Sequence, residues 1–264
     1  MSNTFFQFKQ FIVHQEHTAM KVCTDACLFG AWVAEDVDIL KANNILDIGT
    51  GTGLLSLIVA QAKFPIPEIM DTKTGMKENG NSAKIIAVEI ELDAAKEAKS
   101  NFEASPWKEK IIIENKSIQC FNNTENSLDN LFDCIISNPP FFEGDLQSPN
   151  ANKNIALHST ALPWPELIIH VDRLLKEDGH FYVLIPAIRA YTMQKLVAEK
   201  GIELVEEVVV FNASKQKPFR VLQKFKKTRV PIKQIKRSNF IIKDNENNYT
   251  EAFIHLLKPY YLHL

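Results

Sequence analysis

The sequence predicts an α/β protein: a mostly parallel sheet of seven strands with an antiparallel C-terminal hairpin strand, and helices on both faces. Two observations support this prediction. Short apolar runs that end in polar turns alternate with amphipathic stretches at helical spacing, as in repeated strand–helix–strand units. The last two apolar runs are separated only by the polar loop 212–218, which is too short for a helix. The final strand must therefore pair antiparallel with its neighbour.

The elements follow from apolar spacing and from the residues that end each run. Strands are predicted at 44–48, 84–89, 110–114, 132–137, 180–185, 204–211 and 219–226. Helices are predicted at 54–60, 91–103, 163–175 and 190–200, and Gly179 and Gly201 are read as stops beyond the last two. An amphipathic helix is expected within 20–32, with Thr24 or Asp25 as its N-cap.

A glycine turn follows the first predicted strand. Residues 44–48 run directly into Gly49, Gly51 and Gly53 and then into an apolar helix. Glycines allow positive φ and let a ligand lie against bare backbone, while the helix N-terminus offers unpaired N–H groups. Asp47 precedes the turn, and its carboxylate would repel a phosphate but suits a cationic ligand such as S-adenosylmethionine. We therefore expect these four residues to bind that cofactor.

Two further residues follow neighbouring strand ends. Glu89 ends the second strand, where an acid accepts from ribose hydroxyls in nucleoside-binding doubly wound folds. Asn115, just past the third strand, is placed to meet the adenine or the ribose. Because ligands of such sheets bind at the carboxyl ends of the strands, both are predicted to share a cleft with the glycine turn.

The stretch Ser137-Asn138-Pro139-Pro140-Phe141 follows the fourth strand and suits methylation of an exocyclic amine. The lone pair of such a nitrogen is delocalised, so the amine must be drawn toward tetrahedral geometry before it attacks. The amide oxygen of Asn138 and the carbonyl of Pro139 can accept from the NH₂ group and offset its developing charge. The two prolines stiffen the turn, and Phe141 offers a flat apolar face. Asn138 is also predicted to be a cofactor contact.

Composition sets outer bounds on the function. The net charge is −2, so no global charge signals nucleic-acid binding. No apolar run reaches the length of a membrane span and the first ten residues lack a signal peptide, so we expect a cytoplasmic protein. Cys23 and Cys27 are four residues apart, but no second Cys or His pair accompanies them, so no metal site is expected.

A local basic strip stands out against this balance. From 215 to 237 the chain carries ten cations and no acid, interleaved with Phe219 and Phe225. A solvated hairpin face and a phosphate-contacting surface both fit this pattern. As candidate RNA contacts we take the cations up to position 229: Lys215, Lys217, Arg220, Lys224, Lys226, Lys227 and Arg229.

Taken together, these motifs resemble the class I S-adenosylmethionine-dependent methyltransferases and, more narrowly, the bacterial tRNA1(Val) adenine-N6 methyltransferase family. The likeness runs nearly end to end. Besides the glycine turn, Ala87-Val88-Glu89 and Ser137 to Pro140, it rests on Phe8-Lys9-Gln10-Phe11, Ala19 to Val22, Thr24-Asp25, Gly30-Ala31-Trp32, Ser105-Pro106-Trp107, Asn248 to Phe253 and Tyr260-Tyr261-Leu262.

The resemblance implies a Rossmann-like fold and methylation of N6 of the adenosine 3′ of the anticodon, position 37, in tRNA1(Val). It also implies S-adenosylmethionine as cofactor and tRNA as partner. We expect one methyltransferase domain, acting as a monomer, with a core at 41–230 and an extension at 231–264. Residues 1–40 are expected to cover the cofactor, with Lys21 and Thr24 as contacts.

The methyl acceptor stays open at this point. Phe141 stands where adenine-N6 enzymes often carry Tyr, and Phe is also found in ribosomal-RNA guanine-N2 methyltransferases. The same core motif serves protein-glutamine N5-methyltransferases, although the basic strip favours RNA. A cofactor-binding module without catalysis is the non-enzymatic alternative, and Asn138 argues against it because binding alone needs no amine acceptor.

Overall fold

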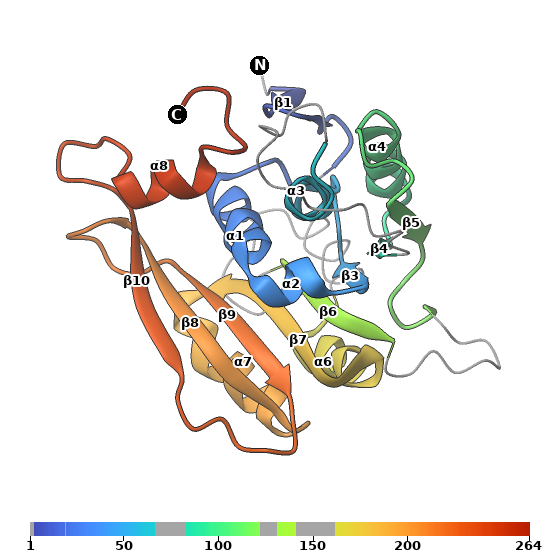
Figure 1. The fold of residues 1–264 in the computed structure, drawn as a ribbon, viewed down its shortest axis with the longest axis vertical. Helices are drawn as coiled ribbons and strands as arrows, with labels where there is room; N and C mark the ends of the chain where they lie inside the picture. The colour runs from blue at the N-terminus through green and yellow to red at the C-terminus, as the bar shows by residue number, and fades with distance from the viewer. Residues whose placement is uncertain (1–2, 19, 67–82, 122–130, 141–161) are drawn as a thin grey trace, which may run out of the picture.

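The computed structural model describes residues 3–18, 20–66, 83–121, 131–140 and 162–264. Its main sheet has the strand order β10-β8-β9-β7-β6-β3-β4-β5 (Figure 1). Every neighbouring pair is parallel except the two that β9 makes with β7 and with β8. The strands are β3 (Asn44–Ile48), β4 (Lys84–Glu89), β5 (Ile111–Asn115), β6 (Phe132–Ser137), β7 (Leu175–Pro186), β8 (Ile202–Ala213), β9 (Arg220–Lys227) and β10 (Lys236–Lys243).

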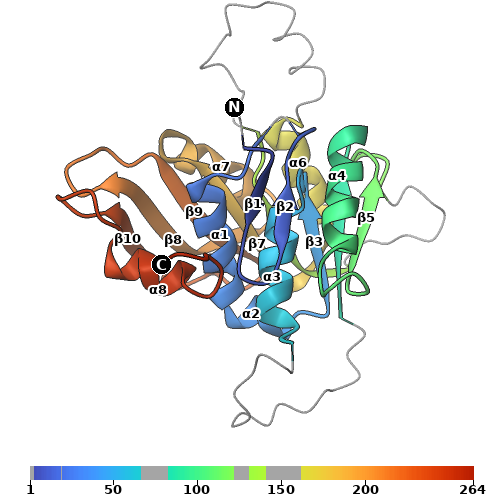
Figure 2. The ribbon, with the colours of Figure 1, turned by 90° about the horizontal axis from the view of Figure 1, so that it is seen from above.

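Helices cover both faces of this sheet, as Figure 2 shows from above. One core cluster joins the sheet to α1 (Thr24–Glu35), α3 (Leu54–Lys63), α4 (Leu92–Glu103) and α8 (Glu251–Leu257). The other cluster joins it to α6 (Trp164–Leu174) and α7 (Ala190–Ala198). A short α2 (Val37–Lys41) and the 3₁₀ turn η2 (Ala187–Arg189) complete the helical elements of the described residues.

The predicted fold class is confirmed, including the antiparallel strand, which is β9. The predicted number of seven strands is wrong, because the described part of the main sheet has eight. The additional strand, β10, pairs in parallel with β8. Its first four residues are polar and exposed, and only Ile242 is fully buried. An edge strand needs only a short apolar face, and so its sequence carries little strand signal.

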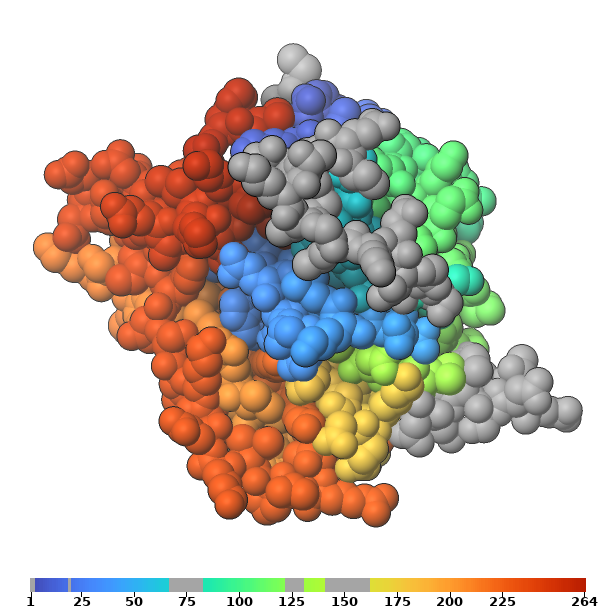
Figure 3. Space-filling model, in the orientation of Figure 1, coloured from blue at the N-terminus to red at the C-terminus, as the bar shows by residue number. Residues whose placement is uncertain are grey.

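The prediction also missed an antiparallel hairpin of β1 (Phe5–Gln7) and β2 (Ile12–His14). A backbone bridge between Phe8 and Tyr261 joins the two ends of the chain. Their rings lie 5.9 Å apart, and Phe11 stacks on Phe8 at 4.5 Å. Figure 3 shows the dark blue N-terminal segment beside the dark red C-terminal one. The aromatic residues at both ends of the sequence therefore form one cluster.

Two predicted helix signals act differently in the structure. Helix α1 begins at Thr24 with Cys23 as its N-cap and without a side-chain cap bond, so the predicted cap is wrong. The carboxylate of Asp25 instead accepts from Arg220 Nε at 2.7 Å.

Gly179 is not a helix stop but lies within β7, where a Cβ atom would come within 2.8 Å of Leu175 Cδ1. Gly201 does follow α7 and has a φ of +69°.

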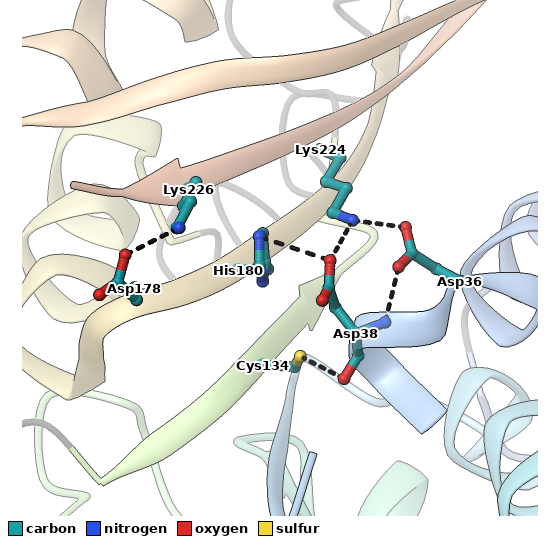
Figure 4. Close-up of polar contacts among 7 residues, drawn as sticks. All are labelled: Asp36, Asp38, Cys134, Asp178, His180, Lys224 and Lys226. Atoms are coloured by element: carbon teal, nitrogen blue, oxygen red, sulfur yellow. Dashed lines mark hydrogen bonds and ion pairs between the residues drawn. The ribbon is translucent and has the colours of Figure 1, made fainter. Parts of the chain in front are cut away.

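A buried ion cluster fastens β9 to the chain around α2 (Figure 4). Lys224 Nζ lies 2.7 Å from Asp36 Oδ2 and 2.6 Å from Asp38 Oδ2, and its side chain is 8% exposed. Burial opposes the charge of Lys224, but the hydrogen bonds and charges of both aspartates raise its pKa above the usual value. His180 lies 3.6 Å from Asp38, and burial together with Lys224 lowers its pKa. The cluster therefore depends on one buried cation.

We predict that Lys224→Met lowers the free energy of unfolding by about 3 kcal/mol, because removing the cation leaves the mostly buried Asp36 carboxylate and the partly exposed Asp38 carboxylate uncompensated. Urea denaturation at pH 7 measures this loss. The matched control is Lys226→Met, since Lys226 pairs with Asp178, which is 73% exposed. That change is expected to cost much less, because solvent screens the pair. Equal losses in the two variants would contradict the assigned role of Lys224.

Candidate functional site

Strand register brings four predicted site residues into one row. Val88 pairs with Ile48 of β3, and Ile48 pairs in turn with Ser137 of β6. The residues that follow, Glu89, Gly49 and Asn138, are therefore level with one another at the carboxyl edge of the sheet. Asn115 of β5 pairs with Glu89 and extends the row by one strand. At roughly 4.8 Å per strand, the row spans about 14 Å.

The glycine turn leaves open space at this edge. Gly49, Gly51 and Gly53 have φ values of +71°, +56° and +83°, in the left-handed region that side chains rarely adopt. A Cβ atom at Gly49 or Gly51 would meet nothing within 4 Å, whereas one at Gly53 would lie 2.3 Å from Phe102 Cε1. Gly53 is thus required also by packing, and the first two glycines expose backbone that a ligand can approach.

Asp47 is fully buried directly beneath the turn. One oxygen, Oδ2, accepts from Thr50 Oγ1 at 2.6 Å and from Ser56 Oγ at 2.7 Å. The other, Oδ1, has no hydrogen-bond partner among the described residues. Burial raises the pKa of this carboxyl to about 6, against the two hydroxyl donors, which lower it. A cationic group that reaches Asp47 would therefore satisfy an acceptor and favour the ionised form.

Glu89 and Asn115 hold the neighbouring turn. The carboxylate of Glu89 accepts from the backbone N–H of Gly51 and of Glu91, both at 2.9 Å. Asn115 donates its amide to the carbonyls of Glu89 at 2.9 Å and Ile90 at 3.2 Å. The acid, the glycine turn and the amide are thus one hydrogen-bonded unit, in which a ribose would meet a carboxylate already fixed in position.

Asn138 stands one strand away from the glycine turn. Ser137 Oγ donates to the carbonyl of Ile48 at 2.9 Å, which ties the two strand ends together. Asn138 Oδ1 is buried and lacks a hydrogen-bond partner within the described ranges. Pro139 is buried and Pro140 is partly buried, whereas Phe141 lies outside the described residues. Within the described residues, the amide oxygen is thus an acceptor that a ligand can use.

The N-terminal segment is clamped onto α4 by two buried side chains that sequence reasoning missed. Asn101 accepts from His14 N at 2.9 Å and donates to His14 O at 3.0 Å and to Thr52 O at 2.9 Å. Glu97 accepts from His17 N, Thr18 N and Thr18 Oγ1 at 2.8–3.1 Å. Through Asn101, this segment and the glycine turn share one amide. The sequence did hold a signal for this clamp. Glu97 and Asn101 are polar residues four apart on α4, and they are buried on it together with Ala94, Ala98 and Phe102.

The two predicted contacts of the N-terminal segment lie beyond this clamp. Lys21 Nζ donates to the carbonyls of Gln15 and Glu16, so its amine holds the segment's own backbone. Thr24 is the exposed first residue of α1. Among the described residues, neither side chain is hydrogen-bonded to the glycine turn, and their contact with a cofactor stays a prediction.

The basic strip is divided by β9. Because β9 is antiparallel, its first residue, Arg220, pairs with Pro186 at the carboxyl edge of β7, whereas Lys226 pairs with His180 toward the other edge. At about 3.3 Å per residue, the two ends of β9 lie roughly 23 Å apart. Lys215 and Lys217 are exposed in the loop before β9 and share the edge of Asn138. The strip is therefore not one surface.

Most of the strip's cations also form ion pairs with acidic side chains from other parts of the chain. The sequence of the strip, which contains no acid, therefore overstates its net positive charge. Lys224 is buried between Asp36 and Asp38 and is not a surface residue. The other ion pairs of the strip are Arg220 with Asp25, Lys226 with Asp178, Lys227 with Asp172, Arg229 with Glu177, Lys236 with Glu206 and Arg237 with Glu207. A cavity of about 260 Å³ lies near the opposite edge, lined by Asp38, Cys134 and His180 among others, and it contains none of the predicted cofactor or catalytic residues.

Two negative observations apply to the described residues only. No helix among them is long and apolar enough to cross a bilayer. Within the same ranges, no group of three or more His, Cys, Asp or Glu side chains is placed to hold a metal ion.

Comparison with solved structures gives the same fold. The chain is similar to a predicted O-methyltransferase from Agrobacterium tumefaciens, with a TM-score of 0.59 and 16% identity, covering 89% of this chain and 96% of that one. It is also similar to P. horikoshii TYW2 in complex with MeSAdo, with a TM-score of 0.54 and 14% identity, covering 85% and 72%. At these identities the likeness concerns the fold alone.

Comparison with protein families and curated proteins is more specific. Residues 39–245 match the family model described as a methyltransferase domain. A protein of Dyadobacter fermentans named tRNA1(Val) (adenine(37)-N6)-methyltransferase is 38% identical, covering 98% of both chains. Proteins of the same name from Phocaeicola vulgatus and Pseudoalteromonas translucida are each 36% identical, covering 97% or more of this chain. The chain therefore belongs to the methyltransferase family whose curated members carry this name.

Proposed function

We propose that this protein is an S-adenosylmethionine-dependent methyltransferase that modifies N6 of adenine 37, 3′ of the anticodon, in tRNA1(Val). The observation that carries the proposal is the buried oxygen of Asn138, which has no hydrogen-bond partner among the described residues and lies level with the glycine turn. The names of the full-length relatives support the choice of acceptor. Action as a monomer in the cytoplasm, and the division into 1–40, 41–230 and 231–264, stay predictions.

The residues around the glycine turn fit S-adenosylmethionine. Asp47 Oδ1 is an unsatisfied acceptor for a cationic donor, and the backbone of Gly49 and Gly51 is open to a ligand. Glu89 would accept from the ribose hydroxyls, beside Asn115. The clamped N-terminal segment would cover the cofactor from the side of α4. When bound, the cofactor supplies an electrophilic methyl group on a sulfonium.

Asn138 and Pro139 would act on the acceptor amine. Their oxygens accept from the NH₂ group, orient its lone pair and offset the positive charge that nitrogen gains as it attacks. Phe141 would stack on the base. The departing proton can pass to solvent after transfer, so the proposed mechanism needs no strong general base. The base must be extruded from its loop, which costs less for a nucleotide that is already unpaired.

Nucleoside mass spectrometry tests the proposal directly. Transfer RNA from cells that lack this enzyme is treated with the protein and labelled cofactor, and then digested. N6-methyladenosine confined to position 37 of one valine tRNA is the expected result. Parallel reactions with ribosomal RNA and with cellular protein test the alternatives. Label in N2-methylguanosine of the ribosomal RNA, or in methylglutamine of a protein, would replace the proposed function by the corresponding alternative. Cofactor binding without any transfer would favour a binding module.

We predict that Asn138→Ala lowers kcat about 100-fold or more, the usual cost of removing one transition-state acceptor or donor. The Kd for S-adenosylmethionine, measured by calorimetry, should stay within about threefold because Asp47 and the glycine turn are intact. Asn43→Ala, an exposed site just before the other end of β3, serves as control. Loss of affinity and turnover to the same extent would refute the assigned role.

The raised pKa of Asp47, about 6, predicts a pH dependence of cofactor binding. A bound cation favours the ionised carboxylate, so affinity should rise with pH through about 6 and level off above it. At pH 5 about one tenth of Asp47 is ionised, and the Kd should be about tenfold weaker than at pH 7.5. In Asp47→Asn this dependence should disappear. The same slope in both proteins would show that another group titrates.

The divided strip predicts unequal effects of its two ends on RNA binding. Lys215→Gln with Lys217→Gln should lower the slope of log affinity against log salt by roughly 1.5, as expected when two phosphate contacts are lost. The matched control, Arg229→Gln with Lys233→Gln, neutralises two exposed cations near the opposite edge. Its slope should stay unchanged. Equal slopes in both double variants would contradict RNA docking at the carboxyl edge.

A further inference from the structure

Two apolar side chains are strongly exposed where the chain leaves β7. Ile188 is 84% exposed and Tyr191 is 68% exposed, and among described large hydrophobic residues only Val230, at 69%, is comparable. Single exposed apolar residues need no explanation, but two neighbours beside a reaction centre indicate a contact surface.

These residues share one face of a helical segment. Tyr191 follows Ile188 by three residues across the η2–α7 junction, and Lys195 follows Tyr191 by four, so the three side chains form a stripe. Lys195 Nζ lies 4.9 Å from the centroid of the Tyr191 ring. Met193 and Val197 are buried on the core side of α7. We call Ile188, Tyr191 and Lys195 the α7 stripe.

The stripe begins at the same edge of the sheet as Asn138. Ser137 pairs with Val183, so Asn138 is level with Leu184, and Ile188 comes only four residues later. On the other side, Pro186 pairs with Arg220, the residue that ends the loop bearing Lys215 and Lys217. Because β7 lies between β6 and β9 in the sheet, the stripe starts between the amide and the two exposed lysines. Figure 2 shows α7 next to α6 on the same face of the sheet.

The chemistry of the stripe matches an unpaired nucleotide. An exposed ring and an aliphatic side chain offer a flat apolar surface for a base, and a lysine beside the ring can meet the phosphate. Lys215 and Lys217 extend the positive charge along the same edge. Glu199 follows one turn after Lys195, toward the far edge, so the cationic and apolar part of the stripe is the part nearest the site.

We propose that the α7 stripe is an RNA-binding surface on which an unpaired nucleotide next to the target adenosine stacks while that adenosine is methylated. The proposal rests on the proposed function and extends it to residues that the basic strip does not include. It places the RNA along the edge from Asn138, over the stripe, to the loop with Lys215 and Lys217.

Steady-state methylation of an anticodon stem-loop tests the proposal. Tyr191→Ser should raise the KM for this RNA at least about fivefold, since stacking of one base contributes at least about 1 kcal/mol. Ile188→Ser with Tyr191→Ser should raise it further, and Tyr191→Phe should retain the wild-type value. The control is Val230→Ser, which removes an equally exposed apolar side chain near the opposite edge. The Kd for S-adenosylmethionine and the Tm report folding.

A second measurement follows the nucleotide itself. With 2-aminopurine beside the target adenosine, binding to the wild type should quench its fluorescence, and Tyr191→Ser should abolish most of that quenching. Stripe variants that match Val230→Ser in KM and in quenching would overturn the proposal. A fall in Tm, or a loss of cofactor affinity by the same factor as the rise in KM, would also overturn it. The patch would then support the protein's own structure. Failure of the proposed function is distinct, since the wild type would then not methylate the RNA.

Discussion

The register of hydrogen bonds between β5, β4, β3 and β6 is the constraint on which the candidate site depends. Side chains alternate between sheet faces, so a slip of one residue would turn a whole strand over and separate the level row of Asn115, Glu89, Gly49 and Asn138. Burial fixes this register. In β3, Ile45, Leu46 and Ile48 are at most 3% exposed. Ile45 belongs to the core cluster on one face of the sheet, and Leu46 and Ile48 belong to the cluster on the other. The apolar cores therefore position the polar site.

Within this framework, a few buried polar side chains connect elements that apolar packing alone would leave independent. Asp47 joins the end of β3 to Thr50 of the turn and to Ser56 of α3. Asn101 joins α4 to the N-terminal segment and to the same turn. Burying such groups costs free energy unless each is hydrogen-bonded. Among the described residues, Asp47 Oδ1 and Asn138 Oδ1 are two of several buried side-chain atoms without a hydrogen-bond partner, and they are the two that a ligand in the candidate site would complete.

Much of the fold could be predicted because its signals are local. Each inner strand is a short apolar run, and the polar loop before β9 forced the antiparallel direction. The residues of the row were found because each follows a strand end. Glu97 and Asn101 were missed because their partners lie 49 to 87 residues away, and a polar residue on a helix looks solvated until its neighbours are known. The basic strip misled for the opposite reason: its residues are close in sequence, but one strand carries them to different edges.

The bonds from Asn101 to His14 also constrain the order in which the molecule can be completed. The two residues are 87 positions apart. At a synthesis rate of 5–20 residues per second, α4 emerges from the ribosome on the order of ten seconds after His14. Until then β1 and β2 form only an isolated hairpin, which is marginally stable in water. The N-terminal segment is thus synthesised before α4 but can pack in its final position only after α4 and the glycine turn have formed.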